Sequence, residues 1–347
     1  MRDREGKQMK TICFGELMLR LAPEGYLRFS QADRFGAVFG GAEANVAVSL
    51  ANFGTEAEFV TKLPQNDIAG AAINSLRRFG VGVSGIVRGG PRLGLYYLEK
   101  GASQRPSKVV YDRAGSSMAL ADPADFDWEK IFEGAGWFHF TGITPALGDN
   151  VAAITMEAAK TAKRMGLTVS ADVNYRQNLW SREKAAKVIG ELMPFVDVCI
   201  TNDGQAKDVF GITPTANELF DGVLTPAGYT RIARELCGRY GFSKVAMTLR
   251  ESISASDNNW AAMMYNGKDS VFSRKYAMHI VDRVGGGDGF GAGLIYALQS
   301  GKNDQDALEF AVAAGCLKHT IEGDYNLVSV SEVEQLAGGD GSGRVQR

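Results

Sequence analysis

Three consecutive glycines directly before an aspartate form the segment of the chain best suited to chemistry. Gly285, Gly286 and Gly287 precede Asp288, and the apolar run Gly289–Leu298 follows at once. Glycines at the start of a helix let backbone N–H groups converge, and the helix dipole adds partial positive charge at the same point. A phosphoryl group in transfer spreads negative charge over its oxygens, so these donors would stabilise it while Asp288 accepts the proton of an attacking hydroxyl. The glycine count alone also fits a flexible loop with an N-capping aspartate.

A second glycine-rich segment lies near the start of the chain, where Gly40 and Gly41 are followed closely by Glu43 and Asn45. Paired glycines let a sugar approach the backbone, and the side chains of Glu43 or Asn45 can bond its hydroxyls. A strand-to-helix turn whose glycines serve packing is the alternative. The later glycine run is not a Walker loop, because no Gly-Lys-Ser/Thr follows it, and a dinucleotide fingerprint should instead open a βαβ unit near an early strand.

Two arginines stand beside aromatic or amide side chains. Arg113 ends the segment Tyr111–Arg113, and Arg176 ends the segment Asp172–Arg176 at the close of an expected strand. The planar guanidinium suits a carboxylate or a phosphate far better than a neutral sugar. The sequence therefore favours an acidic substrate, although a single arginine is more often a solvated surface residue.

Short β-rich runs alternate with longer helical patterns along most of the chain, which is typical of a parallel sheet with covering helices. We therefore expect an α/β fold. Its strands are predicted at Thr11–Gly15, Glu58–Thr61, Trp137–Phe140, Thr168–Asp172, Val198–Thr201 and Lys244–Thr248. Helices are predicted at Asn150–Met165 and at Arg182–Leu192, the latter opened by Ser181 as its N-cap.

Two regions interrupt this alternation, namely Leu17–Phe39 and the pair Gly94–Lys100 and Lys108–Arg113. Their pattern fits strands of a small sheet outside the main one. Such a sheet would cover a cleft and exclude water from a reaction that otherwise wastes its donor. An ordinary extension of the edge of the main sheet is the alternative.

The composition restricts the class of protein. The 347 residues are 45% hydrophobic and 22% charged, with a formal net charge of -2, so disorder is expected only at the ends and nucleic-acid binding is not expected. The four cysteines form no Cys-x-x-Cys pair, which argues against a zinc site or a disulfide framework. No apolar stretch reaches the ~20 residues of a membrane helix, and the charged start Met1–Lys10 lacks a signal-type region. No membrane partner is expected, and the cytoplasm is the expected location.

The order of these features resembles the ribokinase-like, or pfkB, family of carbohydrate kinases from Lys10 to Val330. Gly40–Gly54 is similar to the first signature of the family, Gly-Gly-x-x-x-Asn-x-Ala ending in Phe-Gly. Asp282–Asp288 is similar to the second, normally Asp-Thr-x-Gly-Ala-Gly-Asp. The resemblance implies a doubly wound, mainly parallel sheet with a small β-sheet lid. It also implies one kinase domain over residues 10–332 with lid insertions at 17–39 and 92–115, and disordered tails at 1–9 and 338–347.

The resemblance also implies roles for particular residues. The catalytic group would be Asp288 as the base, with the anion hole at Gly285, Gly286 and Gly287. Within the family, Gly15–Arg20, Tyr111–Ser117 and Thr141–Leu147 are most similar to kinases of 2-keto-3-deoxygluconate. By that similarity the substrate would contact Gly41, Tyr96, Tyr111, Arg113, Arg176 and Asp324. The nucleotide would contact Asn174, Arg176, Asn202, Thr248, Gly285 and Gly287.

Some motifs depart from the family pattern. The family's Asn-x-x-Glu, which organises metal and phosphate contacts, is Asn202–Gln205 here, so a charge is missing. Its Thr-x-Gly-x-x-Gly becomes Thr248–Ile253, without a glycine. Gly286 replaces the usual alanine, and Arg283 stands where threonine is common, close to where some members hold a monovalent cation. Metal ligands therefore stay unassigned, and a monovalent cation is a further candidate ligand.

The resemblance implies transfer of the γ-phosphoryl group of ATP, with Mg²⁺, to the terminal hydroxyl of 2-keto-3-deoxygluconate, giving the 6-phosphate. A related kinase of fructose, ribose or another sugar acid is an alternative, and Arg113 with Arg176 favours an acid. A non-catalytic sugar-binding sensor of the same fold is another, which the altered nucleotide segment supports and the intact Asp288 opposes. The sequence does not separate the gluconate from the galactonate derivative, and it leaves open whether the chain forms a homo-oligomer.

Overall fold

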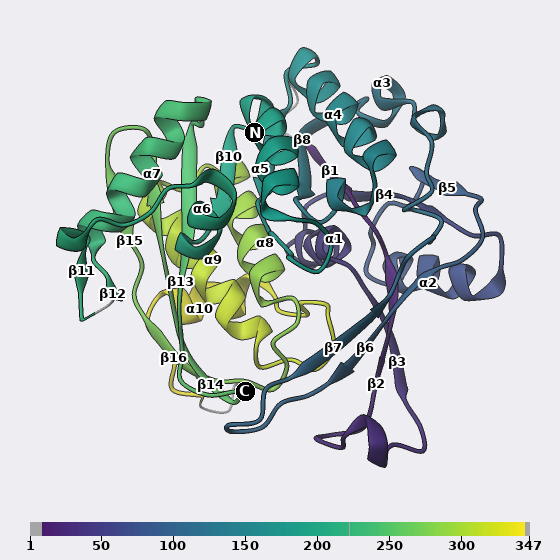
Figure 1. Ribbon diagram of the computed structural model, residues 1–347, viewed down its shortest axis with the longest axis horizontal. Coiled ribbons are helices and arrows are strands. Elements are labelled where there is room, and N and C mark those ends of the chain that lie inside the picture. The colour runs from purple at the N-terminus through teal and green to yellow at the C-terminus, as the bar shows by residue number, and fades with distance from the viewer. Residues whose placement is uncertain (1–8, 222, 344–347) are drawn as a thin grey trace.

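In the computed structural model, which describes residues 9–221 and 223–343, one large sheet runs through the molecule (Figure 1). Its strands in spatial order are β15 (Ser270–Phe272), β14 (Asp257–Tyr265), β13 (Lys244–Ser252), β10 (Val198–Thr201), β9 (Thr168–Asp172), β8 (Ala135–Thr141), β1 (Lys10–Phe14), β4 (Ala57–Leu63) and β5 (Ile86–Arg88), with β16 (Tyr276–His279) beside β14. From β13 to β5 neighbouring strands are parallel, whereas β14 pairs antiparallel with β13, β15 and β16. The predicted α/β fold with a mainly parallel sheet is confirmed.

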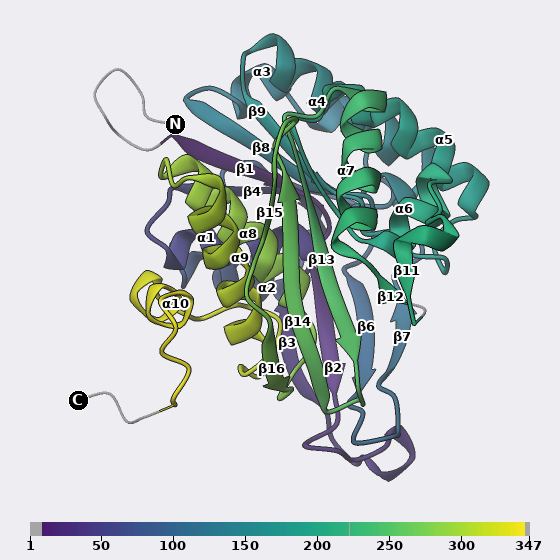
Figure 2. The ribbon, with the colours of Figure 1, turned by 90° about the vertical axis from the view of Figure 1, so that its left-hand side faces the viewer.

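Helices cover both faces of this sheet (Figure 2). One face carries α1 (Ala42–Asn52), α2 (Asp67–Arg77), α8 (Gly286–Gln299), α9 (Asp304–Lys318) and α10 (Val330–Ala337). The other carries α3 (Trp128–Ile131), α4 (Asp149–Arg164), α5 (Arg182–Leu192), α6 (Asp203–Phe210) and α7 (Pro226–Tyr240). Central strands are therefore apolar on both sides: in β10, Val198 and Ile200 enter one core and Cys199 the other.

The remaining short elements lie in the connections. They are the 3₁₀ turns Phe29–Gln31, Pro123–Asp125, Pro145–Leu147, Met193–Phe195 and Ala216–Glu218, and the two-stranded hairpin of β11 (Leu219–Phe220) and β12 (Val223–Leu224).

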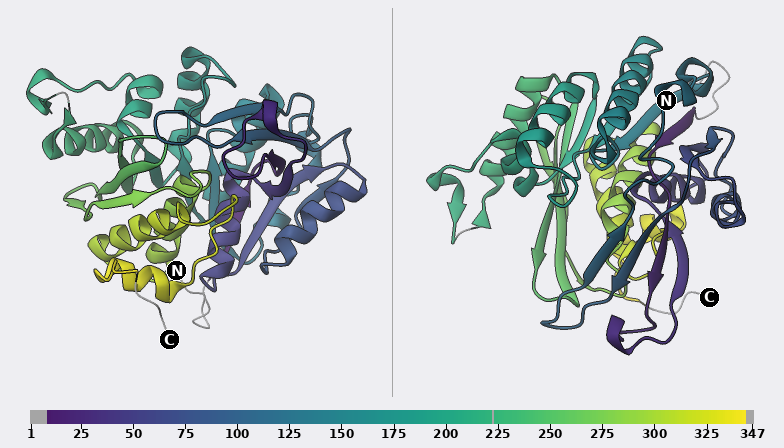
Figure 3. Two further views of the ribbon diagram at one scale, coloured as in Figure 1. Left: turned by 90° about the horizontal axis from the view of Figure 1, so that it is seen from below. Right: turned by 45° about the vertical axis from the view of Figure 1, so that its right-hand side comes forward.

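A separate four-stranded sheet is built from the two regions that break the β/α alternation. Its order is β3 (Gly36–Gly40), β2 (Met18–Ala22), β6 (Gly94–Glu99) and β7 (Lys108–Asp112). The pair β2–β6, whose strands come from the two different regions, is parallel, while the hairpin-like pairs β2–β3 and β6–β7 are antiparallel. Figure 3 shows this small sheet extending beyond the main sheet, alongside the long β13–β14 hairpin. The prediction of a small second sheet is confirmed.

Most predicted elements match the observed ones closely. Strands β9 and β10 and helix α5 have the predicted bounds, and Ser181 caps α5 by accepting a hydrogen bond from the Lys184 N–H at 3.2 Å. The strand predicted at Lys244–Thr248 runs on to Ser252, because it pairs with β14 over its whole length. The tail predicted at 1–9 lies outside the described residues except for Met9. Of the tail predicted at 338–347, residues 338–343 are described and follow the end of α10 at Ala337, and 344–347 lie outside the described residues.

The expectations on cysteines and membrane helices also have structural counterparts. Cys13, Cys199, Cys237 and Cys316 are all free thiols. Among residues 9–221 and 223–343, no helix has the length and apolar character needed to cross a bilayer.

The topology brings the ends of several strands to one place. The strands that follow β1 in the chain, β4 and β5, lie on one side of β1 in the sheet. The later strands β8, β9 and β10 lie on its other side, so the strand order reverses at β1. Crevices at the carboxyl ends of strands on either side of such a reversal are the usual ligand sites of open α/β sheets. The small sheet closes one side of this crevice, since the Ala255 N–H of the β13–β14 hairpin donates to the Ser103 carbonyl at 2.7 Å.

We expect ligands bound beneath the small sheet to slow its amide hydrogen exchange. Strand β7 is exposed and lies at the edge of the small sheet, so those of its amides that do not pair with β6 should exchange readily without ligand. Hydrogen exchange followed by mass spectrometry, with and without saturating sugar acid and nucleotide, should show slower exchange across 94–100 and 108–113. Strand β9, buried in the main sheet, is the internal control. Equal exchange in the two states would argue against a closing sheet.

Candidate active site

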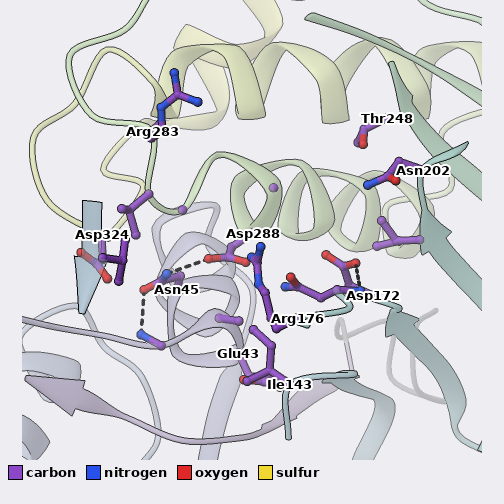
Figure 4. A pocket seen from close by; sticks show the side chains of 18 of the residues that line it. Glu43, Asn45, Ile143, Asp172, Arg176, Asn202, Thr248, Arg283, Asp288 and Asp324 are labelled. Atoms are coloured by element: carbon purple, nitrogen blue, oxygen red, sulfur yellow. Dashed lines mark hydrogen bonds between the residues drawn. The ribbon is translucent and has the colours of Figure 1, made fainter. Parts of the chain in front are cut away.

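One pocket of about 530 Å³ lies at the carboxyl ends of β1, β8, β9, β10 and β13. Its other walls come from the small sheet, the start of α1 and the start of α8 (Figure 4). Every residue predicted to contact the substrate, the nucleotide or the phosphoryl group lines this pocket, with the exception of Gly286. The sequence motifs, although distant along the chain, therefore meet at one site.

The glycine run forms the first turn of α8 rather than a loop before it. Gly285 is the N-cap, with a φ of 83° in the left-handed region that favours glycine, and Gly286 begins the helix. A Cβ on Gly286 would lie 2.1 Å from the His319 ring, whereas the same direction at Gly287 is open space. A ligand can therefore reach the unpaired N–H groups of the first helical turn from the Gly287 side. Asp288 lies inside the helix, which excludes the capping-aspartate alternative.

The orientation of Asp288 is fixed by an asparagine of α1. Asn45 Nδ2 donates to Asp288 Oδ2 at 2.7 Å, and Asn45 Oδ1 accepts from the Gly41 N–H at 3.3 Å (Figure 4). Since the backbone donor determines which end of the amide carries the oxygen, the NH₂ group must face the carboxylate. Sequence analysis gave Asn45 only as a candidate hydroxyl ligand, so its contact with the predicted base is a new finding.

The acidity of Asp288 suits a general base. Burial raises its pKa to about 7, against the lowering effect of the Asn45 hydrogen bond. The nearby carboxylates of Asp172 and Glu43 also raise this pKa, and the charge of Arg176 lowers it. A base whose pKa lies near 7 is half ionised at neutral pH and still has appreciable proton affinity.

The early glycines serve the packing of the protein against itself. A Cβ on Gly41 would lie 2.0 Å from the Glu16 carbonyl oxygen, and a Cβ on Gly40 would lie 2.0 Å from Asp324 Oδ2. Of the two explanations for this glycine pair, packing accounts for the missing side chains. Gly41 nevertheless lines the pocket as the N-cap of α1.

One carboxylate oxygen of Glu43 is bonded to groups of the protein itself. Its Oε1 accepts from the Thr141 N–H at 2.9 Å, the Thr141 hydroxyl at 2.8 Å and the Thr144 hydroxyl at 2.6 Å. These bonds tie α1 to the end of β8, and burial raises the pKa of Glu43 above its ordinary value. Glu43 is therefore a link between elements more than a hydroxyl ligand.

The turn after β9 places Arg176 in the pocket. Burial raises the pKa of Asp172 to about 6, and its Oδ1 accepts from the Asn174 N–H at 3.0 Å. Asn174 has a φ of 35°, a left-handed value uncommon for a residue with a side chain and frequent at functional turns. In Figure 4 the Arg176 side chain extends from this turn toward Asp288.

The two predicted substrate arginines differ in their surroundings. Arg113 is buried and donates from Nε to Glu16 Oε2 at 2.8 Å, with a second bond from its Nη2 to the same oxygen. Arg176 is exposed, and within the described chain it has no ion-pair partner. The charge of Arg113 is thus already balanced, and Arg176 is the arginine free to bind an anion.

The predicted substrate ligands Tyr96 and Asp324 contact each other. The Tyr96 hydroxyl donates to Asp324 Oδ2, while Arg20 donates to Asp324 Oδ1 at 2.8 Å and to Asp282 Oδ2 at 2.6 Å. Sequence analysis missed Arg20 as a site residue, although a charged residue inside the apolar strand β2 was a signal that it has buried partners.

The nucleotide end of the pocket reflects the altered motifs. Asn202 Oδ1 accepts from the Gln205 N–H at 2.9 Å and so caps α6, and Gln205 lines the pocket where the family has a glutamate. Arg250 follows Thr248 on the same side of β13, and both line the pocket together with Arg283. Arg250 stands where the family pattern Thr-x-Gly-x-x-Gly has its first glycine. This replacement could have identified Arg250 from the sequence, but sequence analysis did not single it out.

No group of three or more His, Cys, Asp or Glu side chains among residues 9–221 and 223–343 is arranged to hold a metal ion. A divalent cation in this pocket would therefore take most of its ligands from a bound nucleotide and from water.

Comparison with known proteins places this geometry in context. The profile of the pfkB family of carbohydrate kinases matches residues 8–330. A 2-dehydro-3-deoxygalactonokinase of Haloferax volcanii is 32% identical over 332 residues, which cover 95% of this chain and 98% of the relative. A 2-dehydro-3-deoxygluconokinase of Bacillus subtilis is 26% identical over 92% of both chains. The crystal structure of 2-dehydro-3-deoxygluconokinase from Thermotoga maritima has 50% identity and a TM-score of 0.91, covering 95% of this chain and all of the other.

We predict that kcat/KM falls about tenfold per pH unit below about 7, because Asp288 must be ionised to accept a proton and its pKa is raised to about 7. Asn45→Ala removes a hydrogen bond that lowers this pKa, so the acid limb should move to higher pH. Steady-state rates across pH measure both effects. Asn52→Ala on the same helix, whose side chain bonds the Asn326 carbonyl, is the matched control. An acid limb that Asn45→Ala leaves in place would show that the asparagine does not act on the base.

Proposed function

Since the chain belongs to the pfkB family of carbohydrate kinases, we propose that it transfers the γ-phosphoryl group of ATP to the terminal hydroxyl of 2-keto-3-deoxygluconate, also called 2-dehydro-3-deoxygluconate. The products are the 6-phosphate and ADP. This proposal depends on the position of Asp288. Its carboxylate lies in the first turn of α8, so a base and the open N–H groups of that turn line the same pocket.

The geometry supports a direct transfer. Asn45 occupies Asp288 Oδ2, so Oδ1 is free to accept the proton of the sugar hydroxyl. As that proton leaves, the hydroxyl oxygen bonds to the γ-phosphorus and the bond to the β-phosphate bridging oxygen breaks, releasing ADP. The N–H groups at Gly286 and Gly287 lie where charge on the transferring group needs donors. Holding the hydroxyl, base and donors in one geometry supplies much of the acceleration such enzymes achieve.

Arginines support binding of the triphosphate. Arg176, Arg250 and Arg283 line the pocket, and in the described chain none of them is ion-paired with a carboxylate. Burial lowers the pKa of Arg250, and the neighbouring charges of Arg283 and Arg176 lower it further, as expected where cations gather for an anionic ligand. Mg²⁺ bound to the phosphates would neutralise further charge on them, and its protein ligands remain unassigned.

The substrate acid is supported by Arg176 and by the named relatives. Of the two arginines predicted to bind the substrate, Arg176 is the one without a carboxylate partner in the described chain, and it can pair with a substrate carboxylate, which fructose and ribose lack. The Thermotoga protein, at 50% identity, is named for the gluconate derivative, and the Haloferax relative for the galactonate derivative. The two sugars differ at one hydroxyl, so the galactonate compound is the natural second substrate to test.

The proposal also covers the extent of the kinase domain, the role of the small sheet as a lid and the location of the protein. We take residues 10–332 as one kinase domain in which the insertions at 17–39 and 92–115 act as a lid. The contact of Ser103 with the β13–β14 hairpin fits a lid that reaches across the cleft. Four free thiols fit a reducing compartment such as the cytoplasm.

A coupled assay of ADP release tests the proposal. The panel contains 2-keto-3-deoxygluconate, its galactonate analogue, gluconate, fructose and ribose, each with ATP and Mg²⁺. The highest kcat/KM should belong to the 2-keto-3-deoxy acids. Higher kcat/KM with fructose or ribose would replace the proposal by a neutral-sugar kinase, and binding without ADP release for every sugar would favour a sensor.

We predict that Asp288→Asn abolishes turnover while sugar binding is nearly retained, because the amide keeps the shape but cannot take a proton. Loss of a general base typically lowers kcat about 100- to 10,000-fold. Single-turnover kinetics give the rate, and calorimetry gives the sugar Kd. Retention of more than about a tenth of the wild-type kcat would remove Asp288 from its role.

We predict that Arg176→Ala and Arg113→Ala differ in how they affect acidic and neutral substrates. Arg176→Ala should raise KM for the sugar acid about 10- to 100-fold, the effect of losing a charge-assisted hydrogen bond, and should also lower kcat. Its effect on a neutral ketose analogue should be small for KM. Arg113→Ala should damage both substrates alike, because it leaves Glu16 buried without its partner. If Arg113→Ala instead affects only the acid, Arg113 reads the carboxylate despite its pairing.

A further inference from the structure

Four charged side chains are buried directly behind the first turn of α8. Arg20 is 2% exposed, Asp282 2%, Lys318 0% and Asp324 3%. Arg20 pairs with both carboxylates, at 2.6 Å to Asp282 and 2.8 Å to Asp324. Of these four residues, only Lys318 has no place in the proposed reaction or in the ion pairs, and a lysine so fully buried is rare without a function.

The side chain of Lys318 runs along the anion-binding turn. Its Cβ would be 3.2 Å from a Cβ built on Gly289, and its Cε 3.0 Å from one built on Gly285. The chain thus extends from one end of the turn to the other, and the ammonium lies beyond Cε, next to Gly285. Its Nζ donates to the Ile321 carbonyl at 3.0 Å, in the loop after α9.

Burial raises the pKa of Asp324, and when both carboxylates are ionised the buried charges balance only with a second cation. Asp282 and Asp324 carry two negative charges when ionised, and Arg20 balances one of them. Burial lowers the pKa of Lys318, and the charges of Asp282 and Asp324 act against that lowering. With Lys318 protonated the group is neutral; without it, one negative charge would remain buried at the helix start.

That remaining charge would weaken the site where the phosphoryl group arrives. Asp282 is only three residues before Gly285, and its Oδ1 accepts from the Val284 N–H at 3.1 Å. Net negative charge there would repel a phosphoryl group and offset the positive end of the helix dipole. Neutralising Asp282 and Asp324 is therefore a condition for an effective anion hole.

The same place was expected to suit a monovalent cation, but these residues do not fit one. The direction a Cβ would take at Gly285 is filled by the Asp324 carbonyl at 2.2 Å and by the Lys318 side chain. The Ile321 carbonyl, a natural ligand for such an ion, already accepts from the ammonium. Both carboxylates are already paired with Arg20.

We propose that Lys318 is a positioning residue that acts as a built-in monovalent cation, holding the anion-binding turn neutral and ordered. As a consequence, the protein should need no added potassium or ammonium ion. The turnover part of this inference rests on the proposed kinase function, whereas its effect on ion-dependent stability does not.

The test compares wild type with Lys318→Met, which keeps the length of the side chain and removes the charge. Thermal unfolding and kcat are measured in chloride salts of K⁺, NH₄⁺, Na⁺ and tetramethylammonium at one ionic strength. Wild type should have the same unfolding midpoint and kcat in all four. Lys318→Met should lose about 100-fold in kcat, as when one oxyanion donor is removed. K⁺ or NH₄⁺ should then raise both its midpoint and its kcat.

Controls keep the outcomes separate. Lys184→Met removes a half-exposed lysine whose partner is Asp149 on the surface, and it should behave as wild type in every salt. Activation or stabilisation of the wild type by K⁺ would overturn the proposal, as would a folded Lys318→Met variant that retains wild-type kcat. A loss of kcat and stability that no ion relieves would also overturn it.

Two further measurements cover the remaining cases. If Lys318→Met does not fold, the wild-type salt series together with Lys318→Arg, which keeps the charge and should stay ion-independent, decides the question. If no sugar in the panel is phosphorylated, the proposed function fails, and the unfolding midpoints alone still test Lys318.

Discussion

The guanidinium of Arg20 joins three parts of the molecule that are far apart in the sequence. It lies on β2 of the small sheet and binds Asp282 before α8 and Asp324 after α9. All three side chains are buried, so removal of Arg20 would leave both carboxylates without their ion-pair partner, a loss that typically costs about 3–5 kcal/mol. The position of the small sheet over the pocket, and of the α8 turn within it, depends on this contact.

The remaining electrostatics of the pocket follow from that frame. Arg20 is paired with both Asp282 and Asp324 behind α8, and the open N–H groups of the first turn of α8 attract an anion through the helix dipole. On the pocket side of the turn, charges of both signs surround Asp288. Burial and the carboxylates of Asp172 and Glu43 raise the pKa of Asp288, while the charge of Arg176, which follows β9, lowers it. One side of the pocket thus favours proton acceptance, and the side toward Arg176 favours negative ligands.

Local signals in the sequence were sufficient for much of the fold. The bounds of β9 and β10 were predicted correctly from their place in the alternation of strands and helices, and β10 also contains the short apolar run Val198–Ile200 typical of a strand buried on both faces. The small sheet was predicted from its alternation, but its parallel pair β2–β6 joins two separate regions, and no local pattern reports such a pairing. The length of β13 was underestimated for the same reason, since its end is stabilised by β14.

The site was predictable as a set of residues but not as a network. Glycine runs and arginines indicated which positions meet, whereas the partners of these groups depend on contacts such as Arg20 with Asp324, 304 positions apart. Arg113 illustrates the difference: its type suggested a substrate carboxylate, and its neighbour in space is Glu16. The reasons for Gly40 and Gly41 were equally hidden, because the atoms that exclude a side chain there come from Asp324 and Glu16.

In the proposed reaction, Asp288 directs phosphoryl transfer to the terminal hydroxyl of a 2-keto-3-deoxy sugar acid. The most direct measurement is the proton-coupled phosphorus NMR spectrum of the product formed from 2-keto-3-deoxygluconate, ATP and Mg²⁺. Phosphate on the terminal CH₂ group couples to two equivalent or near-equivalent protons and should appear as a triplet-like signal. A doublet, which reports phosphate on a secondary carbinol, or the absence of any sugar phosphate signal, would contradict the account.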